Sequence, residues 1–335
     1  MNTTKRLFQL LAATILAVVM LNTPLHAQEK QLKFRNGKFK IVQFTDIHWI
    51  YNDPRSDIAG ERMAEVLDAE KPDLVVFTGD VIFAKPARNA LDKALEPTTM
   101  RGIPYAVTWG NHDDEHDMNR KELTDYVIAK PGSLTSTTEG ITGATNYALT
   151  IKSGDGKRDA ALIYIFDSNS YSRNKRVKGY GWINFDQVEW YRTTSQRFTS
   201  ANEGKPMPAL AFFHIPLPEF HEAVKNEGAL MVGTRMEGAC SPNINTGLGA
   251  AMVEAGDVMG VFVGHDHVND YAVDWYGILL AYGRYTGGST VYHGIPEGNG
   301  ARVIELSEGS RDFKTWIRIK GGKTINHINH SANVK

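Results

Sequence analysis

VMGVFVGHDHVND, residues 258–270, places an apolar run directly before two histidines. The run ends at Gly264, and His265 and His267 then flank Asp266. Residues two apart in an extended chain point to the same face, so the two imidazoles share one direction and Asp266 points away from them. This geometry suits metal binding, but it equally suits two ordinary polar residues at a strand end. The stretch alone favours the ordinary reading, and the rest of the chain has to decide.

Composition is that of an ordinary globular chain. Among 335 residues, 42% are hydrophobic and 22% are charged, which allows one large domain or two modest ones. The formal net charge of −1 gives no basic excess, so we expect no nucleic-acid partner. Cys240 is the only cysteine, so the core has to stabilise the fold without an internal disulfide.

The first 27 residues have the pattern of a secretory signal peptide. Lys5 and Arg6 precede an apolar run, Leu7 to Leu21, and small Ala27 marks the expected cleavage site. An uncleaved anchor is the alternative, but the run is short against the roughly 20 residues of a membrane span. We therefore expect a signal peptide over 1–27, an exported protein that is periplasmic or secreted, and no membrane span after signal removal.

The remaining chain alternates apolar strands with amphipathic helices. Because such alternation favours parallel pairing, whereas a hairpin over 146–167 and later strand pairs favour antiparallel pairing, we expect mixed sheets. We predict one domain over 28–320 and a loose polar tail over 321–335. Strands are expected at 38–46, 73–80, 103–113, 207–214 and 258–264, with further strands at 270–276, 278–283, 302–308 and 313–320; helices are expected at 56–72, 88–100, 119–129, 184–201 and 246–256.

Residue types that bind metals follow five of these apolar runs. In open α/β sheets, sites form outside the carboxyl ends of the strands, so we expect the five ends to converge. A glycine before three of the ends leaves the backbone free to turn tightly there. The side chains are Asp46 and His48, Asp80, Asn111 and His112, His214, and finally His265 and His267.

The set of side chains indicates transition metals. Mg²⁺ and Ca²⁺ favour oxygen-only ligands, whereas mixed imidazole and carboxylate suits Zn, Fe, Mn or Co. The set is too large for one ion and suits two. Two metals about 3.5–4 Å apart are a known device for phosphoryl chemistry.

At this point the chain resembles a known superfamily. The ordered motifs D-x-H, G-D, G-N-H-D, H and G-H-x-H resemble the metallophosphoesterase superfamily, also called calcineurin-like phosphoesterases, over most of the chain. DSNSY (167–171), GYGWI (179–183), FHIPLPEF (213–220) and GHDHVND (264–270) are similar to small bacterial, fungal and plant proteins grouped beside the purple acid phosphatases. The resemblance implies an α/β fold, a four-layer α-β-β-α arrangement of two packed mixed β-sheets flanked by helices.

The resemblance also implies residue roles. Asp80 would bridge two ions, and His112 would protonate or stabilise the leaving oxygen, with orientation of neighbouring groups as its alternative role. The catalytic residues are thus expected to be His112 and Asp80. The first ion would be held by Asp46, His48, Asp80 and His267, and the second by Asp80, Asn111, His214 and His265.

Two positions depart from the purple acid phosphatases. Their iron-binding Tyr, three residues after the bridging Asp, is replaced by Phe83, while His48 is a ligand that they lack. We therefore expect no purple charge-transfer band and no obligate ferric iron. Their extra phosphate-site His has no clear counterpart, because His221 is close but out of register.

Several other residues have two readings each. Asp113, Asp114, Glu115 and His116 are expected in a solvated capping loop, with a role around the metals or substrate as the lesser reading. Arg284, near Tyr282 and Tyr285, could meet a phosphate or form a surface ion pair. Four more residues could line the substrate pocket or could have ordinary turn or packing roles: Trp49, Tyr51, Asn243 and Asn245.

The expected function is hydrolysis of a small phosphate ester. We predict an exported dinuclear phosphoesterase that hydrolyses phosphate monoesters by direct attack of a metal-bridging hydroxide, using two divalent or trivalent ions of Mn, Fe or Zn. The alternative is a phosphodiesterase acting on nucleotides, cyclic nucleotides or lipid head groups. Two further hypotheses are a binding protein that has lost catalysis and a scaffold acting on phosphoproteins.

Overall fold

The computed structural model describes residues 31–226 and 228–332. From Leu32 onward, these described residues form one compact unit. The predicted signal peptide over 1–27 lies outside the described residues. Within them, no helix combines the length and the apolar character needed to cross a membrane.

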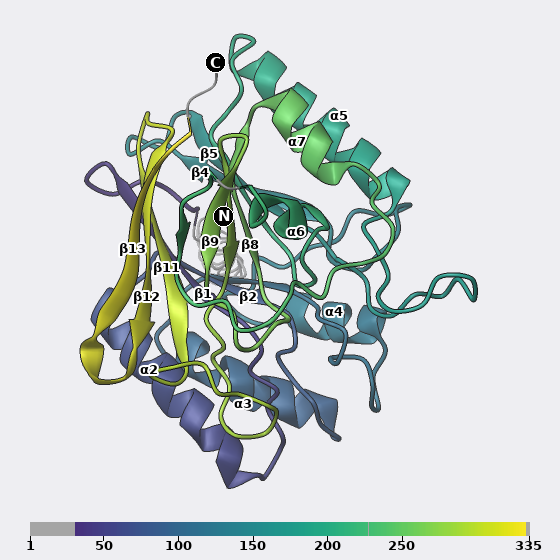
Figure 1. The fold of residues 1–335 in the computed structure, drawn as a ribbon. Coiled ribbons are helices and arrows are strands. Elements are labelled where there is room, and N and C mark those ends of the chain that lie inside the picture. Colours follow the sequence, from purple (N-terminus) through teal and green to yellow (C-terminus); the bar gives the residue numbers. More distant parts are fainter. Residues whose placement is uncertain (1–30, 227, 333–335) are drawn as a thin grey trace, which may run out of the picture. The chain divides into compact units, whose positions relative to one another are not determined.

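Two mixed sheets form the centre of this unit (Figure 1). Within the described residues, the first sheet has six strands, in the order β13 (Thr324–Ser331), β12 (Asp312–Ile319), β11 (Gly300–Ser307), β1 (Lys38–Phe44), β2 (Leu74–Thr78) and β3 (Tyr105–Thr108). The second has seven, in the order β4 (Tyr147–Lys152), β5 (Asp159–Ile165), β6 (Ala209–Phe212), β8 (Val258–Val263), β10 (Ile278–Tyr282), β9 (Ala272–Trp275) and β7 (Met231–Val232).

Pairing is parallel in the middle of each sheet. In the first sheet β1 pairs with β2, and β2 with β3. In the second, β5, β6, β8 and β10 pair in parallel along the sheet order. The remaining pairs are antiparallel. The expected mixture of parallel and antiparallel pairing is therefore confirmed.

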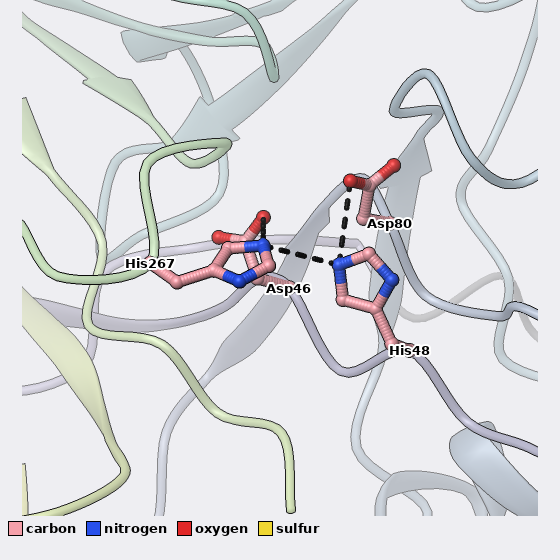
Figure 2. A group of neighbouring side chains, drawn as sticks. All are labelled: Asp46, His48, Asp80 and His267. Atoms are coloured by element: carbon pink, nitrogen blue, oxygen red, sulfur yellow. Dashed lines mark hydrogen bonds and ion pairs between the residues drawn. The ribbon is translucent and has the colours of Figure 1, made fainter. Parts of the chain in front are cut away.

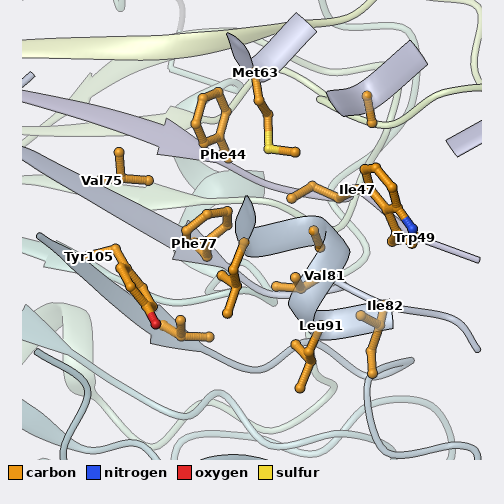
Figure 3. Packing of buried hydrophobic residues seen from close by; sticks show 14 of the residues in the cluster. Phe44, Ile47, Trp49, Met63, Val75, Phe77, Val81, Ile82, Leu91 and Tyr105 are labelled. Carbon is orange, nitrogen blue, oxygen red and sulfur yellow. The ribbon is translucent and has the colours of Figure 1, made fainter. Parts of the chain in front are cut away.

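Helices cover the outer face of each sheet. α2 (Asp57–Glu70), α3 (Ala87–Thr99) and α4 (Arg120–Ile128) pack on the first sheet in one apolar core, part of which Figure 3 shows. α5 (Phe185–Ala201), α6 (Glu219–Ala223) and α7 (Leu248–Ala255) share a second core with the other sheet. A third core joins the two sheets, so the predicted four-layer α-β-β-α fold is confirmed.

Alternation along β2 shows how one strand serves two cores. Val75 and Phe77 belong to the core under the helices, whereas Leu74 and Val76 belong to the core between the sheets. Because successive side chains of a strand point to opposite faces, a strand covered on both faces needs an unbroken apolar run. This is why LVVFT could be recognised as a strand from sequence alone.

The predicted loose tail over 321–335 is wrong for most of its length. Thr324–Ser331 form β13, which pairs antiparallel with β12 at the edge of the first sheet. The strand has the sequence TINHINHS, and seven of its eight residues are partly or fully exposed, which allows its polar side chains. Its pairing uses backbone hydrogen bonds, which polar side chains do not prevent, so composition misled the prediction.

Candidate metal centre

The carboxyl ends of five strands from both sheets supply the predicted ligands. β1, β2 and β3 of the first sheet lead to Asp46 and His48, Asp80, and Asn111 respectively, and β6 and β8 of the second lead to the remaining histidines. His265 donates its backbone N–H to Asp46 Oδ1 at 2.9 Å, which ties the end of β8 to the end of β1. The site therefore lies where the ends of the two sheets meet.

Two glycines permit this close approach. A Cβ on Gly264 would lie 1.9 Å from Thr45 Oγ1, and one on Gly110 would lie 2.1 Å from Asp80 Oδ1. Both distances are far below van der Waals contact, so any side chain there would displace the site. The expected reason, freedom to turn, holds for Gly79 with φ +87°, whereas at the other two positions the reason is space.

Backbone conformation at the ligands is unusual. Asp46, His48, Asp80 and His265 have φ values of 53°, 46°, 49° and 81°, in the left-handed region. A non-glycine residue there carries a cost of roughly 1–2 kcal/mol. Such strained positions cluster at functional sites, where the surrounding structure holds them in place.

Figure 2 shows the first cluster, which joins Asp46, His48, Asp80 and His267. His48 Nε2 lies 3.2 Å from His267 Nε2 and 3.4 Å from Asp80 Oδ2. His267 Nε2 lies 3.6 Å from Asp46 Oδ1. All four side chains are buried, and their nitrogen and oxygen atoms converge on one point.

The second cluster shares Asp80 with the first. It joins Asp80 to His214 and His265, and His214 Nε2 lies 3.2 Å from Asp80 Oδ2. The structure thus brings all seven predicted ligand positions to one region and places Asp80 between two groups. That arrangement is what a bridging carboxylate requires, and the ligand roles themselves stay predictions.

Buried polar atoms without a hydrogen-bond partner indicate that cations fit this site. Among the described residues, four predicted ligand atoms are buried without a hydrogen bond: Asp80 Oδ2, Asn111 Oδ1, His214 Nε2 and His265 Nε2. Buried polar atoms almost always have partners, because leaving one unpaired is costly. Lone pairs that face each other in a buried site suit cations, and mixed imidazole, carboxylate and amide donors suit transition metals.

Backbone carbonyls orient two of the imidazoles. His214 Nδ1 lies 2.8 Å from the Thr78 carbonyl oxygen, and His267 Nδ1 lies 2.9 Å from that of Tyr292. Since a carbonyl only accepts, each Nδ1 carries a hydrogen and each Nε2 faces the cluster, where it offers a lone pair whenever the imidazole is neutral. Metal-binding histidines commonly have such an arrangement.

Burial and charge set the protonation of the cluster. Burial lowers the pKa of His48 to about 3, so this imidazole is neutral at pH 7. Burial also disfavours protonation of His214, but Asp80 and Asp46 outweigh it and raise the pKa of His214 to about 9. The same histidines hold the pKa of Asp80 well below its usual range despite its burial. Without a cation, His214 therefore carries a proton that a metal ion would displace.

Asp113 corrects one prediction, because it is buried rather than solvated. Its Oδ2 accepts the backbone N–H groups of Asp80 at 2.9 Å and Gly110 at 2.7 Å. Its Oδ1 accepts those of Val81 at 2.8 Å and Ile82 at 3.0 Å. One carboxylate thus fixes the loops after β2 and β3 against each other, and so positions Asp80.

His112 lies at the mouth of the centre and belongs to neither ligand cluster. Its side chain is 34% exposed, and its Nδ1 lies 3.0 Å from Glu115 Oε2. Its backbone N–H donates to Asp80 Oδ1 at 2.9 Å, which holds the loop against the cluster. Sequence reasoning missed Glu115 as the partner of this imidazole, although the spacing of three residues could have indicated it.

Three tyrosines that sequence reasoning left without a role surround the ligands. Tyr171 Oη accepts from Asn111 Nδ2 at 3.2 Å, Tyr180 lies edge-on to His265 at 4.4 Å, and Tyr292 stacks on His267 at 4.2 Å between ring centroids. Tyr171 and Tyr180 fall in the DSNSY and GYGWI stretches. Tyr292 sits in a segment without any motif.

Arg284 has neither of its two predicted roles, a phosphate contact or a surface ion pair. It is fully buried, and its Nη1 lies 2.5 Å from Asp270 Oδ2, so it contacts neither a phosphate site nor the surface. Tyr282 donates its hydroxyl to Asp266 Oδ2 at 2.6 Å, and Tyr285 stacks on His267 at 5.4 Å.

The other residues for which the sequence left two alternative roles mostly have packing or hydrogen-bonding roles. Trp49 is buried in the core under the helices, and Tyr51 packs against that core. Phe83 lies edge-on to His112 at 5.5 Å, beside the cluster, where it cannot bind metal. Asn245 Nδ2 donates to Glu219 at 3.0 Å, and Asn243 Nδ2 to the carbonyl of Lys178 at 2.8 Å.

Comparison with known proteins supports the chemistry that this geometry suggests. The family model described as calcineurin-like phosphoesterase matches residues 39–269. Probable inactive purple acid phosphatase 14 of Arabidopsis thaliana is 32% identical, over 90% of this chain and 84% of its own. Phosphatase DCR2 of Saccharomyces cerevisiae is 33% identical, over 85% of this chain and 54% of its own.

A solved structure agrees with the fold. The dimetal phosphatase from Danio rerio has a TM-score of 0.60 and 13% identity, over 88% of this chain and 99% of its own. Together the matches support an enzyme class, the metal-dependent hydrolases of phosphoric esters, although the plant relative has the word inactive in its name. The chain belongs to the calcineurin-like phosphoesterase family.

Proposed function

We propose that this protein is an exported dinuclear phosphatase that hydrolyses phosphate monoesters. The observation that carries the proposal is the position of Asp80, whose buried carboxylate is shared by two clusters of potential ligands. A single ion would leave part of the surrounding donor set unused. The monoester preference rests on the motifs shared with proteins beside the acid phosphatases and on a relative named as a phosphatase.

The residues of the two clusters fit two metal ions. Asp46, His48, Asp80 and His267 would hold one ion, and Asp80, Asn111, His214 and His265 the other. Two bound ions supply Lewis-acid charge to the phosphate and lower the pKa of a water molecule, which makes it a nucleophile near neutral pH. Manganese, iron and zinc all suit this donor set.

The residues around the ligands have separate tasks. We assign His112 to general acid catalysis, in which it gives a proton to the leaving alcohol oxygen; its partial exposure beside the clusters supports this role. Glu115 holds the ring from its other nitrogen and so aims its free nitrogen at the substrate. Asp113 keeps Asp80 in register with the loop that carries Asn111 and His112.

Loss of catalysis is the main rival, since three Arabidopsis thaliana relatives are named as probable inactive purple acid phosphatases. In this chain every predicted ligand and His112 retain residue types competent for the chemistry. That completeness favours an active enzyme over a binding protein. Export is supported by the signal-like pattern of residues 1–27.

The test is metal reconstitution with paired substrates. The protein is stripped of metal, reloaded with Mn²⁺, Zn²⁺ or Fe²⁺, and assayed on 4-nitrophenyl phosphate and on bis(4-nitrophenyl) phosphate. We expect metal-dependent monoester turnover that is lost in Asp80→Asn and reduced about 10²–10⁴-fold in His112→Ala. Asp125→Asn, at an exposed helix position, is the matched control that keeps full activity.

Each other outcome decides against part of the proposal. Turnover of the diester alone would replace the monoesterase with the phosphodiesterase alternative. Two equivalents of bound metal without turnover of either ester would favour the binding protein. Metal binding that survives Asp80→Asn unchanged would remove the bridging role.

A further inference from the structure

The teal segment that joins β5 to α5 contains a strongly basic hairpin (Figure 1). Ser172 N donates to the Gly179 carbonyl at 2.9 Å, and Gly181 N to the Ser170 carbonyl at 2.7 Å, which closes residues 170–181 into a hairpin. Its tip carries four exposed cations within six positions: Arg173, Lys175, Arg176 and Lys178. In 31–226 and 228–332, none of the four forms an ion pair with a carboxylate.

The base of the basic hairpin, residues 170–181, is fixed against the metal centre. Ser170 Oγ donates to the Asn111 carbonyl at 3.2 Å, and Tyr171 Oη accepts from the side chain of the same residue. Tyr180 packs edge-on against His265, and the two hairpin tyrosines stack with centroids 5.7 Å apart. The hairpin therefore contacts two predicted ligands of the second ion, Asn111 and His265. The cations of its tip follow the contacting residue Tyr171 within two to seven positions along the chain.

A cavity of about 610 Å³ lies along the hairpin. Its walls come from residues 169–174, from the start of α4, from residues 142–144, and from Asp114, Gly181, Trp182 and Asn184, so it shares Tyr171 with the edge of the metal centre. This volume is within the range of small-molecule sites. Arg120 in its wall is engaged by Asp114 and Asp167, whereas Arg173 keeps a free guanidinium for a ligand.

The positive charge of the basic hairpin favours binding of an anion. Like charges at neighbouring positions repel each other and destabilise a compact loop, and no carboxylate in the described part of the chain pairs with these four to offset that repulsion. Arginine also offers paired N–H donors that match phosphate oxygens. The cavity adds neutral donors and acceptors and a tryptophan: Asn119, Asn169, Asn174, Asn184 and Trp182.

We propose that the basic hairpin and the adjoining cavity bind a second anionic group of the substrate. The preferred substrates are then phosphate esters that carry a further phosphate or comparable anion on the alcohol part, rather than simple monophosphates. This inference rests on the proposed function, since it adds a subsite to the same centre. The dinuclear centre takes the phosphate to be cleaved, and the hairpin holds the rest of the molecule.

The experiment compares two substrates that differ by one phosphate. Phosphate release from adenosine 5′-monophosphate and from adenosine 3′,5′-bisphosphate is measured with the metal-reconstituted protein at low ionic strength. In the hairpin variant each of the four cations is replaced by Gln. The control variant makes the same change at exposed cations elsewhere: Lys157, Lys205, Arg192 and Arg197.

We expect the bisphosphate to have the higher kcat/KM, and this preference to fall roughly tenfold in the hairpin variant only. Raising the ionic strength from 0.01 M to 0.15 M shortens the screening length from about 30 Å to about 8 Å and should weaken the preference of the parent protein. An unchanged preference in the hairpin variant, with monophosphate turnover intact, would overturn the subsite and leave the proposed function standing.

Two further outcomes separate the hypotheses. If neither these compounds nor 4-nitrophenyl phosphate is hydrolysed, the proposed function fails; if 4-nitrophenyl phosphate is hydrolysed and the nucleotides are not, the proposed function stands. In both cases calorimetric binding of the two nucleotides decides the subsite: tighter bisphosphate binding that the hairpin variant loses supports it, and equal binding overturns it. Hairpin-dependent binding to vesicles rich in phosphatidylserine, with no difference between the two nucleotides, would overturn it in favour of a membrane contact.

Discussion

Asp113→Asn tests how the scaffold positions the bridging residue. The carboxylate accepts four backbone N–H groups at 2.7–3.0 Å, two on each oxygen, and the side chain is buried. Asparagine has nearly the same shape but only one oxygen. Its amide nitrogen would face two N–H donors and could accept from neither.

The magnitude follows from counting those bonds. Leaving a buried N–H donor without an acceptor costs about 1–3 kcal/mol, so two such donors predict a drop of about 2–6 kcal/mol in the free energy of unfolding. Whichever oxygen is lost, a loop flanking Asp80 is released. If it is Oδ2, the N–H groups of Asp80 and Gly110 lose their acceptor. We therefore expect weaker metal binding as well as lower stability.

Urea unfolding of the metal-free protein measures the first effect, and titration with Zn²⁺ against a competing chelator measures the second. Asp125→Asn is the control, because Asp125 is exposed and, among the residues that the structure describes, its one ion pair is with Lys121 on the same helix, where such a pair contributes about 0.3–0.5 kcal/mol. A loss below about 1 kcal/mol in Asp113→Asn, together with unchanged metal affinity, would refute the positioning role.

Four further predictions follow from other contacts. Gly110→Ala puts a Cβ within 2.1 Å of Asp80 Oδ1, so bound metal measured by elemental analysis should fall clearly; full occupancy would contradict the steric argument. Glu115→Gln removes the charge 3.0 Å from His112 Nδ1 and should lower kcat about tenfold with KM and metal content unchanged; an effect on KM alone would point to substrate binding instead. Hydrogen-bond donors from Lys40, Trp316 and Arg318 outweigh burial and lower the pKa of Glu70, so its charged form stabilises the fold at pH values above its ordinary pKa of 4.5. The loss of unfolding free energy in Glu70→Gln, measured by urea unfolding, should be full at pH 7 and shrink as pH falls through the pKa of folded Glu70. A loss that does not change with pH would exclude this linkage. A chain ending at Lys323 should unfold at lower urea than one ending at Ala332, because it lacks β13; equal midpoints would show that β13 contributes nothing.

Much of the fold was predictable because its signals are local. The strand LVVFT is apolar at every position, and a strand buried on both faces needs that pattern. Helix α4 is capped by Asn119, whose side chain accepts from Glu122 N while the Glu122 side chain accepts from Asn119 N, and both residues are visible in the sequence. The tail failed as a prediction because β13 is specified by the edge of β12, which lies outside its own sequence.

The site divides in the same way. The sequence by itself determined which side chains end the strands, since β1, β2, β3, β6 and β8 each run directly into a residue that can bind metal. Only the tertiary structure decided that these ends meet from two different sheets, that Asp113 is buried beneath Asp80, and that the basic hairpin lies against Asn111 and His265. Side-chain direction along a strand follows from its period of two, whereas contacts between segments far apart in the chain depend on how the sheets and loops pack. No local pattern contains that information.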